Sequence, residues 1–337
     1  MTLSLANHEA SLPIAYRLYL PEDWAKDAAR RHKAKIPQTI AFQTKPEIAL
    51  EQIRAARTAG LPQGVVLMDA GYGNDTSLRT EITALGMSYV VGLGPNTSVW
   101  PPGAARLPPQ TRSGRGRPQT RLQRDGEHRP ITVKALALSL PQEAWQTITW
   151  REGSADWLAS RFARRRVRPA HRDTLLSAPR AEEWLLIEWP EDETEPTKYW
   201  FATLPEEIAF DRLVDLAKLR WRIERDYQEL KQELGLGDYE GRGWRGFHHH
   251  ATLCIAAYGF LIAERGAIPP SAPGFSAQLS GSAIPDGYRP RGAADPTRTA
   301  HPKLDRNHAA TPHRRSRQDP TEMPLLQRAY TEDEANP

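Results

Sequence analysis

The chain of 337 residues has a single cysteine, no long hydrophobic run and only a small excess of positive charge. Because Cys254 is alone, an intrachain disulfide and a cysteine-based zinc site are excluded, and a reducing cytoplasm is the expected compartment. The apolar segment LCIAAYGFLIA is too short to span a membrane and predicts a core helix, with Cys254 buried as a small hydrophobe. The amino terminus shows no basic start followed by an apolar core, so no signal peptide is expected.

The composition is that of a soluble globular protein, with 39% hydrophobic and 26% charged residues. The length is sufficient for one large domain or two smaller ones. Lys and Arg total 45 against 41 for Asp and Glu, and the sequence pI is about 9.2. Clusters of basic residues favour a polyanionic partner, although many basic proteins have none.

Alternating strand and helix patterns in the first part of the chain predict an α/β arrangement around a central sheet. Paired strands are expected at 2–5 and 14–20, buried strands at 65–68 and 89–93, and helices at 44–60 and 75–85. Thr44 is suited to cap the first of these helices. Asp69 stands at the carboxyl end of a buried strand, and Gly71 and Gly73 are expected to form a turn after it.

The chain is expected to have four parts. Residues 1–94 and 205–266 form two halves of one α/β core, residues 95–204 a mostly β insertion, and residues 267–337 a disordered tail rich in Pro, Ser, Gly, Arg and Asp. Strands of the insertion are expected at 131–140, 145–150, 161–167, 184–189 and 199–203, and a further helix at 244–265. Trp100 and Trp244 can either stack on an unpaired base or pack in the core or a hairpin, and packing is favoured.

One side of a long helix, predicted to begin near Leu216, carries three charged residues. Arg220, Glu224 and Lys231 are spaced four and seven residues apart, so they lie nearly above one another at ~3.6 residues per turn. The neighbouring apolar stripe consists of Leu216, Leu219, Ile223, Tyr227, Leu230 and Leu234. Glu224 is therefore expected at the edge of the core, where a carboxylate can bind metal beside two basic groups that face an anion. The alternative is an ordinary amphipathic helix with mixed charges on its polar face.

The string RWRIE followed by YQELKQ resembles the tyrosine, arginine, glutamate, lysine signature of bacterial insertion-sequence transposases of the DDE superfamily. Arg220, Glu224 and Lys231 match that signature residue by residue, whereas its tyrosine falls on Ala217, which removes one contact to substrate phosphate. DAGYG, which begins at Asp69, matches the second acid of the family. The resemblance extends over residues 2–265.

The resemblance implies a ribonuclease-H-like mixed sheet with flanking helices, interrupted by the β insertion. It implies that Asp69 and Glu224 are catalytic carboxylates that bind Mg²⁺, or Mn²⁺ in its place. Arg220 and Lys231 are expected to hold DNA phosphates. For the arginine-rich segment 106–129 and for the run Arg161, Arg164, Arg165, Arg166 and Arg168, DNA contact and a solvated basic surface are the alternatives.

The implied partners are double-stranded DNA, both transposon ends and target, and a second copy of the chain in a synaptic homodimer. The implied location is the bacterial cytoplasm at the nucleoid, without membrane attachment. The implied reaction is hydrolysis at transposon ends followed by transfer of the 3′-hydroxyl to target DNA.

A third carboxylate is not apparent in the sequence. The family's first aspartate lies on a strand ahead of the hairpin that begins here at Thr2. Glu9 is expected in a turn and Asp23 at a helix start, so neither is expected to replace that ligand. We therefore expect a transposase that lacks its amino-terminal portion and is catalytically impaired. The alternatives are a non-catalytic DNA-binding remnant or regulator, and a metal-dependent nuclease of the same fold that does not transpose.

Overall fold

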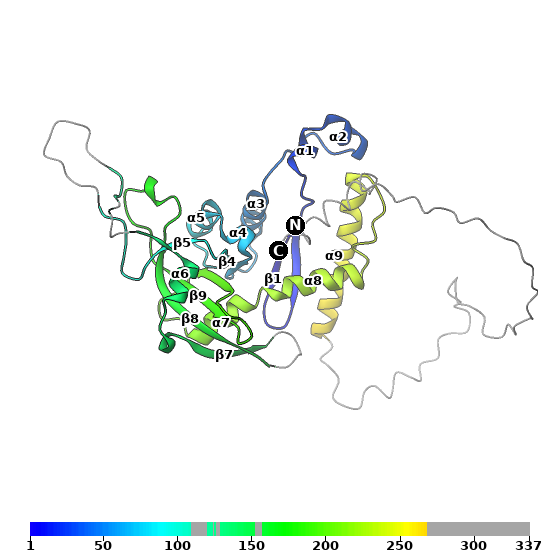
Figure 1. Ribbon diagram of the computed structural model, residues 1–337. Helices are drawn as coiled ribbons and strands as arrows, with labels where there is room; N and C mark the ends of the chain where they lie inside the picture. Colours follow the sequence, from blue (N-terminus) through cyan, green and yellow to red (C-terminus); the bar gives the residue numbers. More distant parts are fainter. Residues whose placement is uncertain (109–119, 124, 126–128, 152–156, 268–337) are drawn as a thin grey trace, which may run out of the picture. The chain divides into compact units, whose positions relative to one another are not determined.

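The computed structural model describes residues 1–108, 120–123, 125, 129–151 and 157–267 (Figure 1). Contacts between residues divide the chain into two units, Met1–Gly259 and Phe260–Pro337, and the described strands belong to the first unit. The predicted tail, beyond residue 267, lies outside the described residues. Among the described residues, no helix combines the length and the apolar character needed to cross a membrane.

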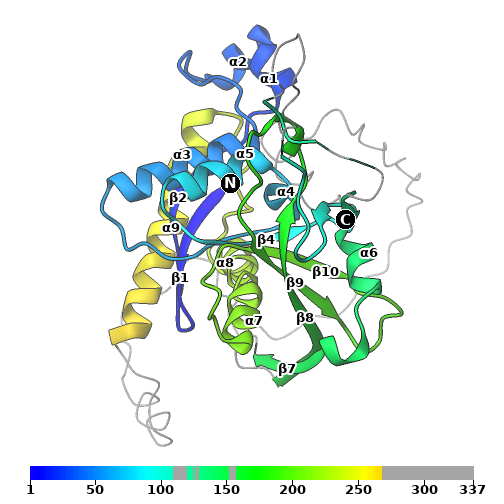
Figure 2. The same cartoon turned by 90° about the vertical axis from the view of Figure 1, so that its left-hand side faces the viewer.

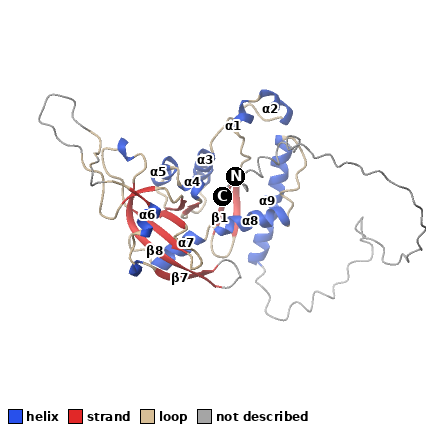
Figure 3. Ribbon diagram, viewed as in Figure 1, coloured by secondary structure: helices blue, strands red, loops and turns tan. Residues whose placement is uncertain are grey.

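The strands of the described residues form two sheets (Figure 3). β1 (Thr2–Ala6) and β2 (Ser11–Tyr16) make an antiparallel hairpin, as the sequence predicts. The eight-stranded sheet has the order β3 (Val66–Met68), β4 (Tyr89–Leu93), β10 (Lys198–Ala202), β9 (Glu183–Trp189), β8 (Trp157–Pro169), β5 (Ser98–Trp100) and β6 (Ile131–Thr132), with β7 (Gln146–Arg151) also paired to β8. β3 and β4 run parallel and the other pairs antiparallel, so the sheet is mixed.

The helices of the described residues accompany these sheets (Figure 2). They are α1 (Glu22–Lys26), α2 (Ala28–Ala34), α3 (Lys45–Thr58), α4 (Ala70–Gly73), α5 (Thr76–Ala84), α6 (Val133–Leu138), α7 (Phe210–Lys218), α8 (Trp221–Gln232) and α9 (Trp244–Ala267), with short 3₁₀ turns at Gln142–Ala144 and Asp173–Leu175. The predicted cap of α3 is confirmed: Thr44 accepts a hydrogen bond from the Glu47 backbone, and the Glu47 carboxylate accepts one from the Thr44 backbone. This reciprocal pair satisfies two backbone donors that the helix start leaves open.

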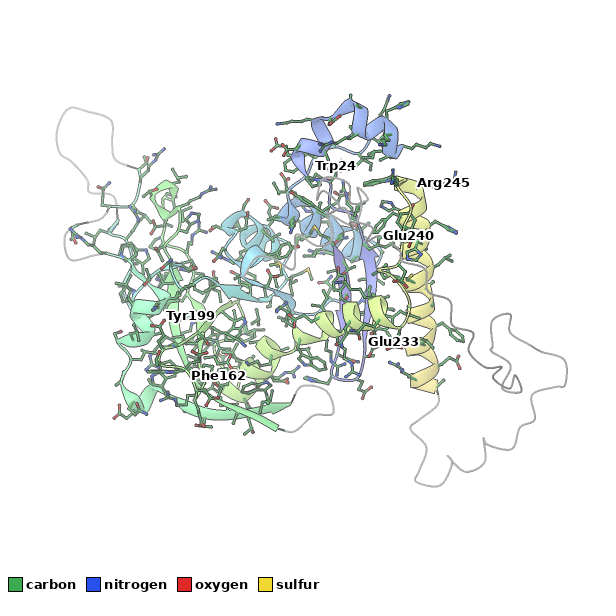
Figure 4. All side chains as sticks on the ribbon, turned by 45° about the vertical axis from the view of Figure 1, so that its right-hand side comes forward. Trp24, Phe162, Tyr199, Glu233, Glu240 and Arg245 are labelled. Atoms are coloured by element: carbon green, nitrogen blue, oxygen red, sulfur yellow. The ribbon has the colours of Figure 1, made fainter. Side chains whose placement is uncertain are left out.

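The large sheet buries both of its faces. One core includes Val91, Leu185, Ile187, Tyr199 and Phe201, and a second core on the opposite face includes Val90, Phe162, Trp184, Leu186 and Trp200. Successive residues of a strand point to opposite faces, which is why neighbours such as Tyr199 and Trp200 fall in different cores. Figure 4 labels one residue from each core, Phe162 and Tyr199. All five residues of β4 are buried, so the predicted doubly covered strand is confirmed.

The segment predicted as a strand at 131–140 is mainly helical. Only Ile131 and Thr132 pair as strand β6, and α6 follows at once. The Thr132 hydroxyl accepts a hydrogen bond from the Ala135 backbone and so caps the helix. Val133, Leu136 and Ala137 are buried at three- and four-residue spacing, which is the period of a helix face rather than of a strand.

The turn predicted at Gly71 and Gly73 is the single-turn helix α4, which packs directly against β4. A Cβ atom on Gly73 would overlap the carbonyl oxygen of Gly92, and one on Gly92 would lie 2.9 Å from the backbone nitrogen of Ala70. Two glycines therefore let the backbone after Asp69 approach the buried strand more closely than any side chain allows.

Gly73→Ala is expected to lower the free energy of unfolding by about 1–3 kcal/mol, the usual cost of overpacking a dense site. The atom that the new methyl group meets is backbone, which cannot move aside as a side chain can. Gly64→Ala is the matched control, because a Cβ atom there meets nothing within 4 Å. Urea unfolding of both variants measures the difference, and equal stabilities would contradict the close packing of α4 on β4.

Candidate functional site

Asp69 lies where the sequence places it, at the carboxyl end of β3. It is exposed, and its Oδ1 atom accepts a hydrogen bond from the backbone nitrogen of Tyr72 at 3.3 Å. The carboxylate thus caps α4, because the first turn of a helix leaves backbone donors without partners. The strand fixes the position of the acid, while its exposure leaves it accessible to a ligand.

Glu224 lies in the first turn of α8 with 62% of its side chain exposed. The prediction that it stands at the edge of the core is therefore wrong. Its Oε1 atom is 2.5 Å from Nη2 of Arg220, which confirms that these two residues are neighbours one turn apart. Lys231 lies in the last turn of the same helix.

The single long helix predicted from Leu216 onward is two helices. α7 ends at Lys218 and α8 begins at Trp221. At the junction, the backbone nitrogens of Arg222 and Ile223 donate to carbonyls three residues earlier, each at 3.2 Å. This tighter bonding pattern interrupts the helix, and it leaves Arg220 between the two segments.

The helix is broken between α7 and α8 because the two segments pack against different parts of the protein. α7 buries Leu213, Val214, Leu216 and Ala217, which belong to the second core. α8 instead contacts strand β2 of the hairpin. The buried residues of α7 and those of α8 do not lie along one face of a straight helix. A single helix therefore could not pack against both the second core and strand β2.

A buried ion pair fixes the end of α7. The Lys218 ammonium group donates to both carboxylate oxygens of Glu188, at 2.6 and 2.7 Å, and it lies 4.1 Å from the ring centre of Trp150. Both charged side chains are almost fully buried. Loss of either partner leaves an uncompensated charge in the interior, so the pair strongly specifies where α7 rests on β9.

A buried carboxylate that the sequence pattern does not single out holds α8 to its neighbours. Asp226 is 2% exposed and accepts hydrogen bonds from the hydroxyl of Ser11 on β2, at 2.5 Å, and from that of Tyr258 on α9, at 3.0 Å. Burial raises the pKa of Asp226, and the two hydroxyl donors partly offset that rise. The sequence feature that points to Asp226 is its position between Ile223 and Leu230, where a charged residue interrupts the apolar stripe of the helix.

The arginines of β8 are engaged within the protein. The Arg164 guanidinium lies 4.7 Å from the ring centre of Trp184 and 4.9 Å from that of Phe210, and it donates to the carbonyl of Ile208 at 2.7 Å. Arg165 donates to the carbonyl of Arg164 at 2.9 Å, and Arg166 to that of Glu182 at 2.8 Å. A guanidinium has five N–H donors, so these contacts leave DNA binding by Arg164, Arg165 and Arg166 a prediction.

Several other residues predicted as possible DNA contacts are either buried or lie outside the described residues. Arg106 is buried and lies 2.8 Å from Asp173, so for this member of the arginine-rich segment the DNA-contact prediction is wrong. Arg112, Arg115, Arg117 and Arg124 lie outside the described residues. Trp100 and Trp244 are both buried, which confirms core packing over base stacking.

The donor chemistry of Asp69 and Glu224 fits a hard divalent cation. Carboxylate oxygens are preferred by Mg²⁺, which needs only one or two of them when waters and substrate phosphate complete its shell. Within the described part of the chain, no group of three or more His, Cys, Asp and Glu side chains lies close enough to hold a metal ion. Glu9 lies in the hairpin turn and Asp23 in the first turn of α1, as predicted for both.

The mixed sheet flanked by helices, with an acid at the end of its parallel strand β3, is that of an α/β protein of the ribonuclease-H-like type. Residues 1–156 match the family model described as DDE superfamily endonuclease. The match confirms the resemblance to DDE-type transposases. It includes Asp69 but ends before Arg220, Glu224 and Lys231, whose roles stay predictions. No curated protein matches the chain.

Asp226→Asn is expected to remove a pH dependence of stability. Because the folded-state pKa of Asp226 is raised, its stabilising contribution is complete below the unfolded pKa and is lost as pH rises through the folded pKa. The asparagine variant should therefore gain stability relative to the native chain as pH increases from acidic to neutral.

Urea unfolding across that pH range measures this difference. Asp226→Ala is the comparison: it removes the same titrating group and should show the same pH trend, but it should be about 1–3 kcal/mol less stable than Asp226→Asn because the hydroxyls of Ser11 and Tyr258 lose their acceptor. A difference between the asparagine variant and the native chain that does not change with pH contradicts the raised pKa.

Proposed function

We propose that this chain derives from the transposase of a bacterial insertion sequence, which cleaves and transfers DNA strands with Asp69 and Glu224 as metal-binding carboxylates. The observation that carries the proposal is the match of residues 1–156 to the DDE superfamily endonucleases, a family whose name implies DNA cleavage. Asp69 lies within that match at the end of a strand, where ligands of α/β sheets are commonly bound.

Glu224 is free to take a ligand at small cost. Its contact with Arg220 is an exposed ion pair on one helix, and such pairs contribute only ~0–1 kcal/mol. If the Glu224 side chain rotates to bind a cation, the guanidinium group of Arg220 becomes available to a DNA phosphate beside that cation. Lys231 adds a second positive charge at the far end of α8.

A bound Mg²⁺ or Mn²⁺ ion would activate water or a 3′-hydroxyl and stabilise the leaving oxygen. The role of this chain's residues is to supply oxygen ligands, Asp69 and Glu224, and to hold phosphate through Arg220 and Lys231. Two carboxylates suit one such ion with waters and phosphate, whereas a two-ion site requires a third acid.

We infer that this chain alone is catalytically impaired, because the described residues bring together no group of three metal-binding side chains. Among the described residues β1 pairs only with β2, and β3 pairs only with β4. Each of these strands therefore has an open edge, which natural sheets usually cover or blunt.

Double-stranded DNA, as transposon ends and target, is the partner on this proposal, and the bacterial cytoplasm at the nucleoid is the location. The enzyme would act as a homodimer in a synaptic complex. We assign residues 1–94 and 205–266 to the catalytic core and 95–204 to the insertion. Strand β10 of that insertion pairs with β4 of the core, so the two segments share one sheet.

A non-catalytic DNA-binding remnant or regulator is the second candidate. The observation that favours it is that no group of three metal-binding side chains occurs among the described residues. An assay of transposon-end cleavage with Mg²⁺ or Mn²⁺ distinguishes the transposase from the remnant. It compares the native chain with the Glu224→Gln variant. Absent cleavage by both proteins together with retained DNA binding supports the remnant, and cleavage lost only in the variant supports the enzyme. A nuclease that does not transpose would cleave without joining strands.

Asp69→Asn and Glu224→Gln are each expected to weaken Mn²⁺ binding by at least about 10–100-fold, which is the effect of losing even an outer partner of a metal ligand. Calorimetric titration of the full chain with Mn²⁺ in the presence of DNA measures this. Glu233→Gln is the matched control, since Glu233 is another exposed acid at the end of α8. Binding by Glu224→Gln that equals the native chain would exclude Glu224 as a ligand.

Arg220→Ala and Lys231→Ala should each reduce the slope of log K against log salt for DNA binding by ~0.9, the value for one lost phosphate contact. Arg225→Ala is the control, because Arg225 lies on another side of α8 and pairs with Glu229 at 3.0 Å. Slopes from binding measured at several salt concentrations decide the question. If the control variant changes the slope as much as the other two, α8 contributes only a diffuse charge.

A further inference from the structure

A small cavity lies among three arginines near the end of strand β8. Arg106, Arg168 and Arg180 line it together with Asp173 and Trp100, and it leaves about 10 Å³ for the centre of a water-sized particle. A single water molecule needs about 10–15 Å³ by the same measure, so the cavity has room for one particle of that size. It therefore suits a ligand of one atom and excludes a nucleotide or a sugar.

Each of the three guanidinium groups has a buried nitrogen that lacks an acceptor. Among the described residues, Nη2 of Arg106, Nε of Arg168 and Nε of Arg180 are shielded from solvent and make no hydrogen bond. Arg106 as a whole is only 6% exposed. Buried N–H groups of folded proteins nearly always have a partner, which can be an ordered water or an ion. Three such donors around one cavity therefore indicate an acceptor inside it.

Asp173 is the acid that lines the cavity, and both of its oxygens are engaged. Its Oδ1 atom lies 2.8 Å from Nε of Arg106, and its Oδ2 atom accepts a hydrogen bond from the indole of Trp100 at 2.7 Å. The carboxylate is almost fully buried, so water does not compete for these contacts. Asp173 therefore balances the charge of Arg106.

The remaining charge around the cavity is positive. Glu182 pairs with Arg168 at 3.2 Å. Glu183, the next acid along the chain, interacts with Arg180 and with two further arginines, so it does not balance Arg180 alone. The three arginines that line the cavity thus exceed their paired acids by one positive charge. An excess charge shielded from water favours a counter-ion, because the low local dielectric strengthens their attraction.

An anion fits these donors better than a water molecule does. A water molecule accepts hydrogen bonds and also has to donate its own, and the carboxylate oxygens of Asp173 already have partners. An anion accepts from every N–H group around it and donates none. Its hydrogen bonds to guanidinium groups are charge-assisted, which makes them shorter and stronger than those of a neutral acceptor.

We propose that the cavity among Arg106, Arg168 and Arg180 binds one small monovalent anion of the size of chloride. The anion connects the segment after β5, the end of β8 and the segment before β9, since each of them supplies one of the arginines. Arg106 also donates to the carbonyl of Leu122 at 3.1 Å, so the site holds a fourth segment indirectly. The proposal invokes neither DNA nor a metal ion, and it stands or falls independently of the proposed DNA cleavage.

Thermal unfolding of the full chain, without DNA or metal, tests the site. Chloride replaces gluconate at constant ionic strength, because gluconate is too large for the cavity. The unfolding midpoint should rise with chloride concentration and level off, as for a saturable site of the folded state, and bromide should act in the same way. Arg180→Gln should raise the apparent dissociation constant for chloride by about tenfold or more, the effect of losing one hydrogen bond to a charged group.

Arg172→Gln is the matched control for the unfolding measurement. It removes the same charge from an exposed position that does not line the cavity, so it should keep the native response to chloride. Equal responses of the native chain and Arg180→Gln would indicate a general salt effect and overturn the proposal. A native midpoint that does not respond to chloride would overturn it as well.

Crystals of the native chain soaked in bromide give a test that does not depend on the folding of a variant. An anomalous peak within hydrogen-bond distance of Arg106, Arg168 and Arg180 is the expected result. Peaks at the protein surface alone would contradict the proposal. Density in the cavity without an anomalous signal would contradict it too, because it would identify the occupant as water.

Discussion

Strand β4 is the constraint on which the rest of the structure depends. All five of its residues are buried, it pairs in parallel with β3 and in antiparallel with β10, and it supplies residues to both cores. Because Gly92 in this strand has no side chain, the backbone that follows Asp69 can pack directly against it. A strand covered on both faces cannot slip by one residue without exchanging its two sets of side chains, so its register fixes β3 and hence the position of Asp69.

Buried polar groups then determine where the helices rest. The Lys218–Glu188 pair ends α7 against β9, and Asp226 attaches α8 to the hairpin and to α9. Apolar packing alone tolerates shifts along a helix, whereas a buried charge without its partner is costly. The helix that carries Glu224 is therefore located by Lys218 before it and by Asp226 within it. Both residues control where Arg220, Glu224 and Lys231 lie.

Much of this arrangement could be predicted from local sequence, and the failures have physical causes. Wholly apolar runs correctly predict strands β3 and β4, and Thr44 with Glu47 correctly predicts the start of α3. These predictions succeed because each pattern is contained within a few residues. The strand expected at 131–140 and the continuous helix through Arg220 failed, since tertiary partners decided between competing local patterns. The same reason limits the candidate site: the position of Asp69 follows from its own strand, but whether Asp69 and Glu224 share one cation depends on distant contacts.

Whether Asp69 and Glu224 bind one cation can be measured with Fe²⁺ in place of Mg²⁺. With ascorbate and peroxide, a bound Fe²⁺ ion generates radicals that cut the polypeptide near its ligands, and the cuts are located by mass spectrometry. We expect two cuts in the full chain bound to DNA, one beside Asp69 and one beside Glu224, both suppressed by excess Mg²⁺. Cutting beside only one of these residues, or at neither, would contradict a shared metal site.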